Sequence, residues 1–223
     1  MNSQFKTPYG PLLSAAILSI MAVTVHATPI ITSENSAAGT TFTTVPNPSS
    51  TDLAQTGVFS LISGTPHPPL SGPITKLQNG VIQPASDAPG ESYFADEVLH
   101  FIFQVDLGAA YSISNVVTFS RHPGVRAPQK YNLSGSNNGT VFTTITDVLN
   151  TIGGGAWANS ITDSTGSLGN YRYLRIDAHP FNGTNGAFYG EVDVYGSVVP
   201  EPASLALLGL GLFGLGFSRR KKT

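Results

Sequence analysis

The chain has no cysteine and few charged residues, and both absences restrict what it can be. Without cysteine, neither a disulfide nor a thiolate zinc site can form. Stability must therefore come from packing and from any ion held by oxygen ligands. Charged residues make up only 11% of the 223 residues, whereas glycine (24) and proline (16) are plentiful. A neutral polar composition of this kind favours an exported all-β protein.

Basic residues are scarce in the body of the chain. Between Thr28 and Ser197 there are six basic and twelve acidic residues, a net charge of −6, whereas the whole chain carries −2. Nucleic-acid binding requires a basic surface that neutralises phosphates. The composition therefore excludes nucleic acid as a partner and is compatible with neutral polymers or cations.

Catalytic motifs are also lacking. The sequence contains no G-x-S-x-G nucleophile motif, no H-E-x-x-H zinc motif and no Cys/His pair. We therefore expect a protein that is not an enzyme.

The N-terminal end has the three parts of a signal peptide. Lys6 precedes an apolar run from Leu12 to Val25, which ends in His26-Ala27 before Thr28-Pro29. We predict that residues 1–27 form a signal helix, that signal peptidase cuts after Ala27, and that the mature chain begins at Thr28.

The C-terminal end also has three parts in a fixed order. Pro200-Glu201-Pro202 is followed by an apolar segment from Ala203 to Phe217 and then by four basic residues, Arg219, Arg220, Lys221 and Lys222. As a helix the apolar segment covers about 22 Å, which is less than the hydrocarbon core of about 30 Å. The basic residues are expected to stay in the cytoplasm, which leaves the rest of the chain outside the inner membrane.

This tail, residues 198–223, closely resembles the PEP-CTERM sorting tail of Gram-negative bacteria. The resemblance implies recognition by an exosortase through Pro200, Glu201 and Pro202, with Arg219 and Arg220 completing the motif. An ordinary transmembrane anchor remains the alternative, since a short apolar helix can span a thinned bilayer.

The middle of the chain has the pattern of short β-strands. Residues 28–72 are rich in Thr, Ser and Pro and are expected to provide part of the first strands. Six later runs are rich in β-branched and aromatic residues between turn signals: Val98–Asp106, Tyr111–Ser120, Tyr131–Ser136, Val141–Thr146, Tyr171–Asp177 and Phe188–Tyr195. Alternation with a period of two and short spacing predict an antiparallel β-sandwich.

Residues 73–197 carry a second resemblance. The runs Gln104–Gly108, Tyr131–Gly139, Tyr173–Ile176 and Gly190–Gly196 occur in the order typical of the discoidin, or coagulation-factor type C, family. The resemblance implies a galactose-binding-like jelly-roll β-sandwich, flanked here by the signal helix and the short C-terminal apolar helix.

The same resemblance implies a structural Ca²⁺ site and no other cofactor. In the family, a loop matching Leu77–Gly80 wraps the ion and a glutamate from the last strand completes its ligands, which points to Asn79 and Glu191 here. Calcium takes six to eight oxygen ligands. Asn79 stands where relatives have aspartate, and an Asn-Gly turn with no metal is the alternative.

Family members bind sugars with loops at one end of the sandwich. The matching positions lie in two loops of this chain: Arg121, His122 and Arg126, and His179, Phe181 and Asn182. Tyr93 and Phe94 could contribute from a third loop. The only tryptophan, Trp157 in a glycine-rich stretch, could stack on a sugar ring or anchor its loop in the core.

The sequence thus predicts an exported, exosortase-sorted surface or extracellular-matrix protein whose sandwich binds carbohydrate, specifically exopolysaccharide. The alternative is a structural or adhesion protein of the matrix that binds no sugar and carries glycans itself. Its predicted partners are signal peptidase, the exosortase, polysaccharide and the inner membrane.

Overall fold

The computed structural model describes residues 28–36, 39–67, 70–82, 93–95, 101–151, 153–180 and 186–199. These residues form ten strands and two short 3₁₀ helices: β1 (Pro29–Ser36), η1 (Leu53–Thr56), β2 (Val58–Ser63), η2 (Ile74–Gln78), β3 (Tyr93–Ala95), β4 (Phe101–His122), β5 (Lys130–Ser136), β6 (Thr143–Leu149), β7 (Gly155–Asp163), β8 (Gly169–His179), β9 (Ala187–Tyr189) and β10 (Glu191–Val198). Both predicted terminal helices lie outside the described residues. Within the described ranges, no helix is long and apolar enough to cross a membrane.

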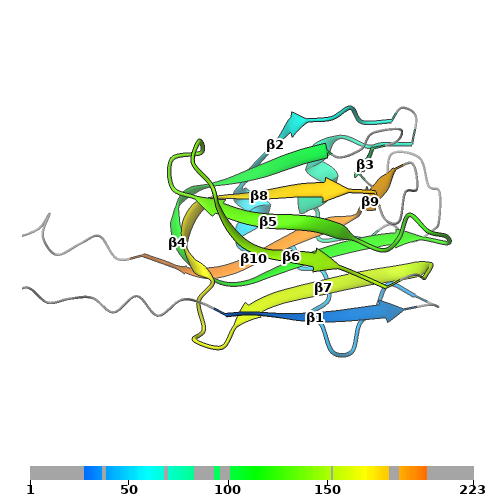
Figure 1. Cartoon of the computed structure of the whole chain (residues 1–223), viewed down its shortest axis with the longest axis horizontal. Helices are drawn as coiled ribbons and strands as arrows, with labels where there is room; N and C mark the ends of the chain where they lie inside the picture. The colour runs from blue at the N-terminus through cyan, green and yellow to red at the C-terminus, as the bar shows by residue number, and fades with distance from the viewer. Residues whose placement is uncertain are drawn as a thin grey trace, which may run out of the picture.

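The strands pair antiparallel in a sandwich, which confirms the predicted fold class (Figure 1). The main sheet has the order β1-β7-β4-β8-β5-β6, and β2 and β10 also pair with β4. The part of β4 up to Asp106 pairs with β2 and β8, whereas the part from Tyr111 onward pairs with β10 and β7 and only at its start, Tyr111–Ile113, with β8. The single strand β4 therefore belongs to both layers of the sandwich.

β4 changes layer at a bend between Asp106 and Tyr111. The register of its pairing with β8 shifts there, and Gly108 has a φ of 80°, a conformation that favours glycine. The Asp106 carboxylate accepts the Gly108 N–H at 2.8 Å and is paired with Arg172 at 2.8 Å. Two of the runs predicted as separate strands, Val98–Asp106 and Tyr111–Ser120, are joined by this bend.

The main core lies between the layers and is rich in aromatic rings. Phe101, Phe103 and Tyr189 are almost fully buried, with ring centroids 5.5–5.9 Å apart. Full burial of one such side chain contributes roughly 1.5–3 kcal/mol. Both described core clusters consist of residues between Phe42 and Val194, so a fragment 28–199 contains the whole described core.

The segment before β2 covers the outer face of the β10-β4-β7 layer. Phe42 packs on Phe119 with a centroid distance of 5.7 Å, in a cluster that also contains Val45 and Val117. The strands β1 and β2, which lie within residues 28–72, pair with β7 and β4 and are integral to the sheet.

The carboxylate of Glu34 on β1 holds this covering segment in place through hydrogen bonds. Its carboxylate accepts the N–H groups of Thr43, Thr44 and Val45 and the hydroxyls of both threonines, at distances between 2.6 and 3.1 Å. These bonds, the Thr44 hydroxyl first among them, lower the pKa of Glu34 to about 2.

We expect the hydrogen bonds to the Glu34 carboxylate to make the stability of the fold depend on pH in the acid range. Because the folded pKa lies below the ordinary value of 4.5, the stabilisation is present above pH 4.5 and is lost as pH falls toward 2. In melting experiments the advantage of the native protein over Glu34→Gln should shrink across this range. A difference that does not change with pH would contradict the assignment.

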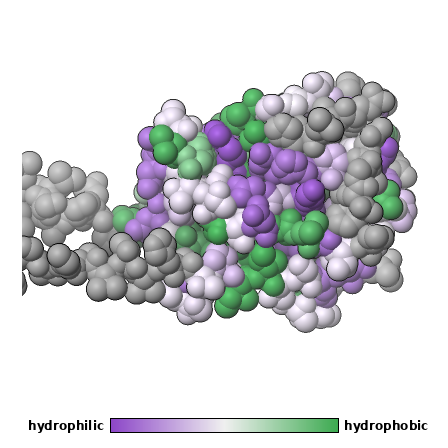
Figure 2. Space-filling model, in the orientation of Figure 1, coloured by the Kyte–Doolittle hydropathy of each residue, from purple (hydrophilic) through white to green (hydrophobic). Residues whose placement is uncertain are grey.

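The surface is polar with small, separate apolar areas. Figure 2 shows hydrophilic and near-neutral residues over most of one face, with hydrophobic areas between them. The exposed large apolar residues come from many elements: Ile30, Ile31, Val58, Ile62, Val81, Val125, Val141, Leu149 and Val198. Scattered apolar residues of this kind are ordinary on protein surfaces.

Candidate functional site

The sandwich has two distinct ends. At one end, which we call the loop end, β4 ends at His122, β8 ends at His179 and β7 begins at Gly155. His122 and Gly155 are paired in the antiparallel register of β4 and β7. At the opposite end, the termini end, β1 begins at Pro29 and β10 finishes at Val198 (Figure 1). The eight residue steps of β7 separate the two ends by roughly 26 Å.

Four of the predicted ligand residues belong to the loop end. Arg121 and His122 are the last residues of β4, Arg126 lies in the turn that follows, and His179 is the last residue of β8. All four are partly exposed. The other two predicted ligand residues, Phe181 and Asn182, lie outside the described residues.

His122 is held in a defined orientation. Its Nδ1 accepts the Gly124 N–H at 3.0 Å, and its ring lies against the ring of Phe188 with a centroid distance of 5.4 Å. Because Nδ1 acts as an acceptor, the neutral imidazole carries its proton on Nε2. The Nε2 of His179 lies 3.4 Å from a carboxylate oxygen of Asp177, and the His179 side chain is 40% exposed.

Close packing shapes the loop that carries these residues. Gly154 lies so near the Pro123 backbone that a Cβ at this position would be 2.1 Å from the Pro123 carbonyl oxygen. Trp157 follows on β7, is only 6% exposed and donates its Nε1–H to the Gly153 carbonyl at 3.0 Å. Of the two roles considered for Trp157, the structure thus confirms the core anchor and contradicts the exposed platform.

Tyr93 is likewise a core residue. It is 2% exposed and packs against Phe101 and Phe103 with centroid distances of 5.9 and 6.3 Å. Its ring is therefore not available for stacking on a sugar. The side chain of Phe94 lies outside the described set.

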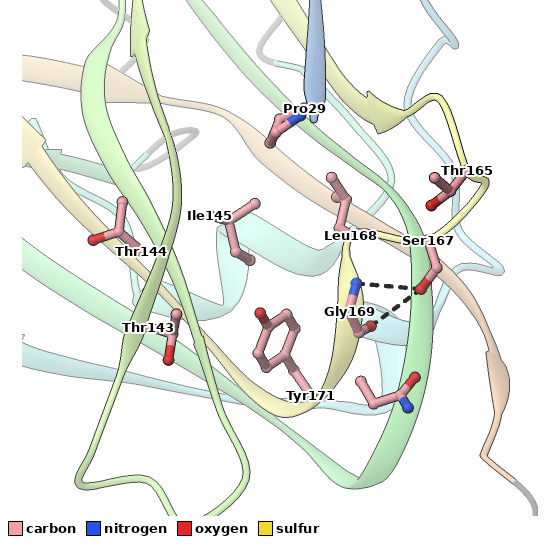
Figure 3. A pocket seen from close by; sticks show the side chains of 10 residues that line it. Pro29, Thr143, Thr144, Ile145, Thr165, Ser167, Leu168, Gly169 and Tyr171 are labelled. Atoms are coloured by element: carbon pink, nitrogen blue, oxygen red, sulfur yellow. Dashed lines mark hydrogen bonds between the residues drawn. The ribbon is translucent and has the colours of Figure 1, made fainter. Parts of the chain in front are cut away.

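A cavity of about 410 Å³ lies at the termini end, away from the predicted ligand residues (Figure 3). Its walls come from β1, β6, the turn between β7 and β8, and the start of β8. The lining side chains are uncharged: Pro29, Thr143, Thr144, Ile145, Thr165, Ser167, Leu168, Gly169, Asn170 and Tyr171.

Glu191 connects the first residue of β10 to the Asn79 loop. It is fully buried, and its Oε2 accepts the N–H groups of Asn79, Gly80 and Val81 at 2.9, 2.8 and 3.3 Å. The two residues predicted as metal ligands, Asn79 and Glu191, are thus in contact. The contact uses the backbone N–H of Asn79, and the amide oxygen of that side chain accepts the Val81 N–H.

Two further buried acids lie on β10 or against it, and sequence reasoning missed both. Asp193 is on the same face of β10 and accepts the Ser49 N–H at 2.9 Å. Asp52 caps η1 through the Ala54 N–H and also accepts the Val194 N–H at 2.9 Å. All three carboxyl groups are at most 8% exposed.

Burial makes all three acids costly to ionise, and for two of them a neighbouring carboxylate adds to the cost. Burial and then the charge of Asp193 raise the pKa of Glu191 to about 8. Burial and then Asp52 raise the pKa of Asp193 to about 7, and burial raises the pKa of Asp52.

Each of these acids also has one buried oxygen that accepts no hydrogen bond within the described residues: Asp52 Oδ2, Glu191 Oε1 and Asp193 Oδ1. Buried unpaired oxygens of acidic groups suit a hard cation. In the described part of the chain, no three His, Asp or Glu residues are grouped closely enough to hold a metal ion. Any cation here would therefore need carbonyl oxygens as well.

Two family models match the chain. Residues 97–176 match the NedA-like, galactose-binding domain, and residues 198–221 match the PEP-CTERM protein-sorting motif. A motif of the second kind implies export, processing by an exosortase and sorting to the cell surface. A comparison with curated proteins gave no match.

Solved structures share the fold at low sequence identity. The lectin binding domain of lectinolysin, complexed with Lewis b, is 18% identical with a TM-score of 0.51; the match covers 68% of this chain and 99% of that one. The C-terminal domain of a chitobiase from Bacteroides fragilis is 19% identical with a TM-score of 0.50 and coverages of 67% and 99%. A fucolectin from striped bass (Morone saxatilis) serum is 16% identical with a TM-score of 0.50 and coverages of 69% and 50%.

These matches agree with the resemblances found in the sequence. The domain match begins within the segment that leads into β4 and ends in β8. The chain carries a galactose-binding-like domain of the coagulation-factor type C, or discoidin, family and a PEP-CTERM sorting motif.

Proposed function

We propose that this chain is an exported surface or matrix protein of a Gram-negative bacterium. We propose further that its loop end binds carbohydrate and that the ligand is exopolysaccharide. The observation that carries the proposal is the position of Arg121, His122, Arg126 and His179. All four belong to one end of a rigid sandwich, and the chain leaves the domain for both termini at the other end.

The chemistry of these side chains suits sugar hydroxyls. Guanidinium groups donate several hydrogen bonds in a fixed plane, and a histidine held through Nδ1 directs its other nitrogen consistently. The net charge of −6 in the body favours a neutral or weakly charged polymer over a strongly anionic one.

The arrangement of the two ends also fits a sorted protein. A tail held at the membrane, before or after exosortase processing, would extend from the termini end beside Val198. The loop end would then face away from the membrane, toward the surrounding polymer. The lectinolysin domain, which shares the fold, was solved with Lewis b bound, and this supports a sugar-binding role for the fold.

One observation favours the alternative, a matrix protein that binds no sugar. The cavity described above lies at the termini end rather than among the predicted ligand residues. A purified fragment 28–199 should be applied, with calcium present, to a glycan array and to polysaccharide from the host. Binding to either supports the proposal. Binding to neither, together with heavy O-glycosylation of the native protein, would favour the matrix protein that binds no sugar.

We also propose that the acid cluster of Asp52, Glu191 and Asp193 binds a structural Ca²⁺. Glu191 and carbonyl oxygens of the Asn79 loop would hold the ion, and the two aspartates would balance its charge. The unpaired buried oxygens of these acids support the proposal. The ion would stabilise the attachment of the Asn79 loop to β10.

Calcium is therefore expected to raise the melting temperature of fragment 28–199. At free calcium a hundredfold above Kd, the stabilisation is about 2.7 kcal/mol, or roughly 5–10 °C for a domain of this size. Magnesium should have a smaller effect because it prefers a stricter octahedral geometry. An unchanged melting temperature on adding EGTA to protein purified with calcium would sink the calcium proposal.

A further inference from the structure

The start of β1 lies beside a buried aspartate. Thr28 directly precedes Pro29, the first residue of β1, and Pro29 is opposite Asp163, the last residue of β7, in the antiparallel register. Proline has no N–H, so at this corner of the sheet the backbone donor before Ile30 is the nitrogen of Thr28, an exposed residue.

Asp163 is only partly satisfied by its neighbours. It is 7% exposed, and its Oδ1 accepts the N–H of Thr165 at 2.7 Å and also the hydroxyl of Thr165. Its Oδ2 is buried and, among the described residues, accepts no hydrogen bond. A buried carboxylate oxygen without a donor is costly and indicates that a donor or a cation belongs there.

The antiparallel register places Thr28, the residue before Pro29, next to Asp163. The pKa of Asp163 is lowered by the Thr165 hydroxyl first, and the backbone N–H groups of Thr165, Thr28 and Ser164 contribute as well. Figure 3 shows Pro29, which follows Thr28, and Thr165, which donates to Asp163, in the lining of the cavity at the termini end. The nitrogen of Thr28 and the unpaired oxygen thus belong to one corner of the fold.

We propose that Asp163 is the acceptor for the α-ammonium group that removal of the signal peptide creates at Thr28. Signal peptidase adds water across the Ala27–Thr28 bond, which leaves a carboxylate on Ala27 and an ammonium on Thr28. The nitrogen changes from a neutral amide with one donor into a cation with three. It then supplies the donor and the charge that Asp163 Oδ2 lacks.

The proposal links processing to folding. Before cleavage, residue 27 occupies one bond of the nitrogen and no charge is present, so the start of β1 is held less firmly. After cleavage, the ion pair fastens edge strand β1 to β7. Cutting one residue earlier would move the ammonium by about 3.5 Å along the chain, so the position of the cut decides whether the ion pair forms.

The test compares two N-termini in two backgrounds. Fragment 28–199 is made with a free N-terminal Thr28 and, separately, with Gly-Ser attached before it; each is made with Asp163 and with Asp163→Asn. With Asp163, the free form should melt roughly 2–4 °C above the extended form. In Asp163→Asn this difference should vanish, whereas it should persist in the control Asp147→Asn, which changes an exposed aspartate on β6.

Two further measurements keep the proposal testable if Asp163→Asn does not fold. Nα-acetylation of the free Thr28 form removes the charge without touching Asp163, and it should lower the melting temperature as much as the extension does. N-terminal sequencing of the exported protein should return Thr28. Equal melting of free, acetylated and extended forms, or a mature terminus at another residue, would overturn the proposal.

Discussion

Replacing Glu191 by alanine is expected to lower the free energy of unfolding of fragment 28–199 by about 3 kcal/mol. The substitution removes the acceptor of three N–H groups, those of Asn79, Gly80 and Val81. Each buried donor left without a partner costs about 1–3 kcal/mol. Because the Asn79 loop is partly exposed, water recovers some of this loss, which places the total at the lower end of the sum for three donors, about 3 kcal/mol. Urea unfolding followed by fluorescence measures it.

Glu191→Gln is the matched control for this prediction. The glutamine carbonyl oxygen can accept the same N–H groups, so most of the stability without calcium should be retained. The amide lacks the second carboxylate oxygen and the charge, so the calcium-dependent gain in melting temperature should be lost. If the Glu191→Ala variant is as stable as the native protein, the hydrogen bonds between Glu191 and the Asn79 loop do not stabilise the fold. If glutamine keeps the full calcium response, Glu191 is not a ligand.

Removing single side chains of the loop end is expected to reduce carbohydrate affinity. A hydrogen bond from a charged donor contributes about 1.5–3 kcal/mol, so Arg126→Ala should weaken binding roughly tenfold or more. His122→Ala should have a comparable effect, because it removes both the imidazole and the acceptor that orders the Gly124 turn. Affinity is measured by isothermal titration with the best glycan from the array.

Arg172→Ala provides the control for charge. Arg172 pairs with Asp106 near the bend of β4, which is at the termini end, so its loss changes the net charge equally without touching the loop end. We expect its affinity to match that of the native protein. Equal losses for Arg126→Ala and Arg172→Ala would mean that binding follows overall charge and not a site.

The sequence predicted the sandwich because strand signals are local. Alternation of apolar residues in Phe101–Asp106 and in β10 depends only on which side faces the core. The strand β7 was missed, because its sequence GAWANSITD begins with a glycine and is buried on both faces, which removes the alternation. Burial of Asn159 and Ser160 depends on partners such as Asn150 and Asn115, which no local pattern reveals.

The grouping of the proposed ligand residues was predictable only where they follow one another at strand ends. Arg121, His122 and His179 could be placed in one region because the family resemblance orders the loops. The acid cluster could be recognised only in part, since Asp52 joins β10 through Val194, 142 positions away in the chain. Asp163 gave no sequence signal at all: its importance lies in a buried oxygen without a donor, which is a property of the packed structure.

The central claim is that the loop end is the end that binds carbohydrate. Backbone chemical shifts of isotopically labelled fragment 28–199, recorded while host exopolysaccharide fragments are added, test it most directly. We expect the largest shifts in residues 121–126, 153–155 and 179, with little change near Thr143 and Tyr171. Shifts concentrated around the cavity at the termini end, or no shifts at saturating polysaccharide, would contradict the account.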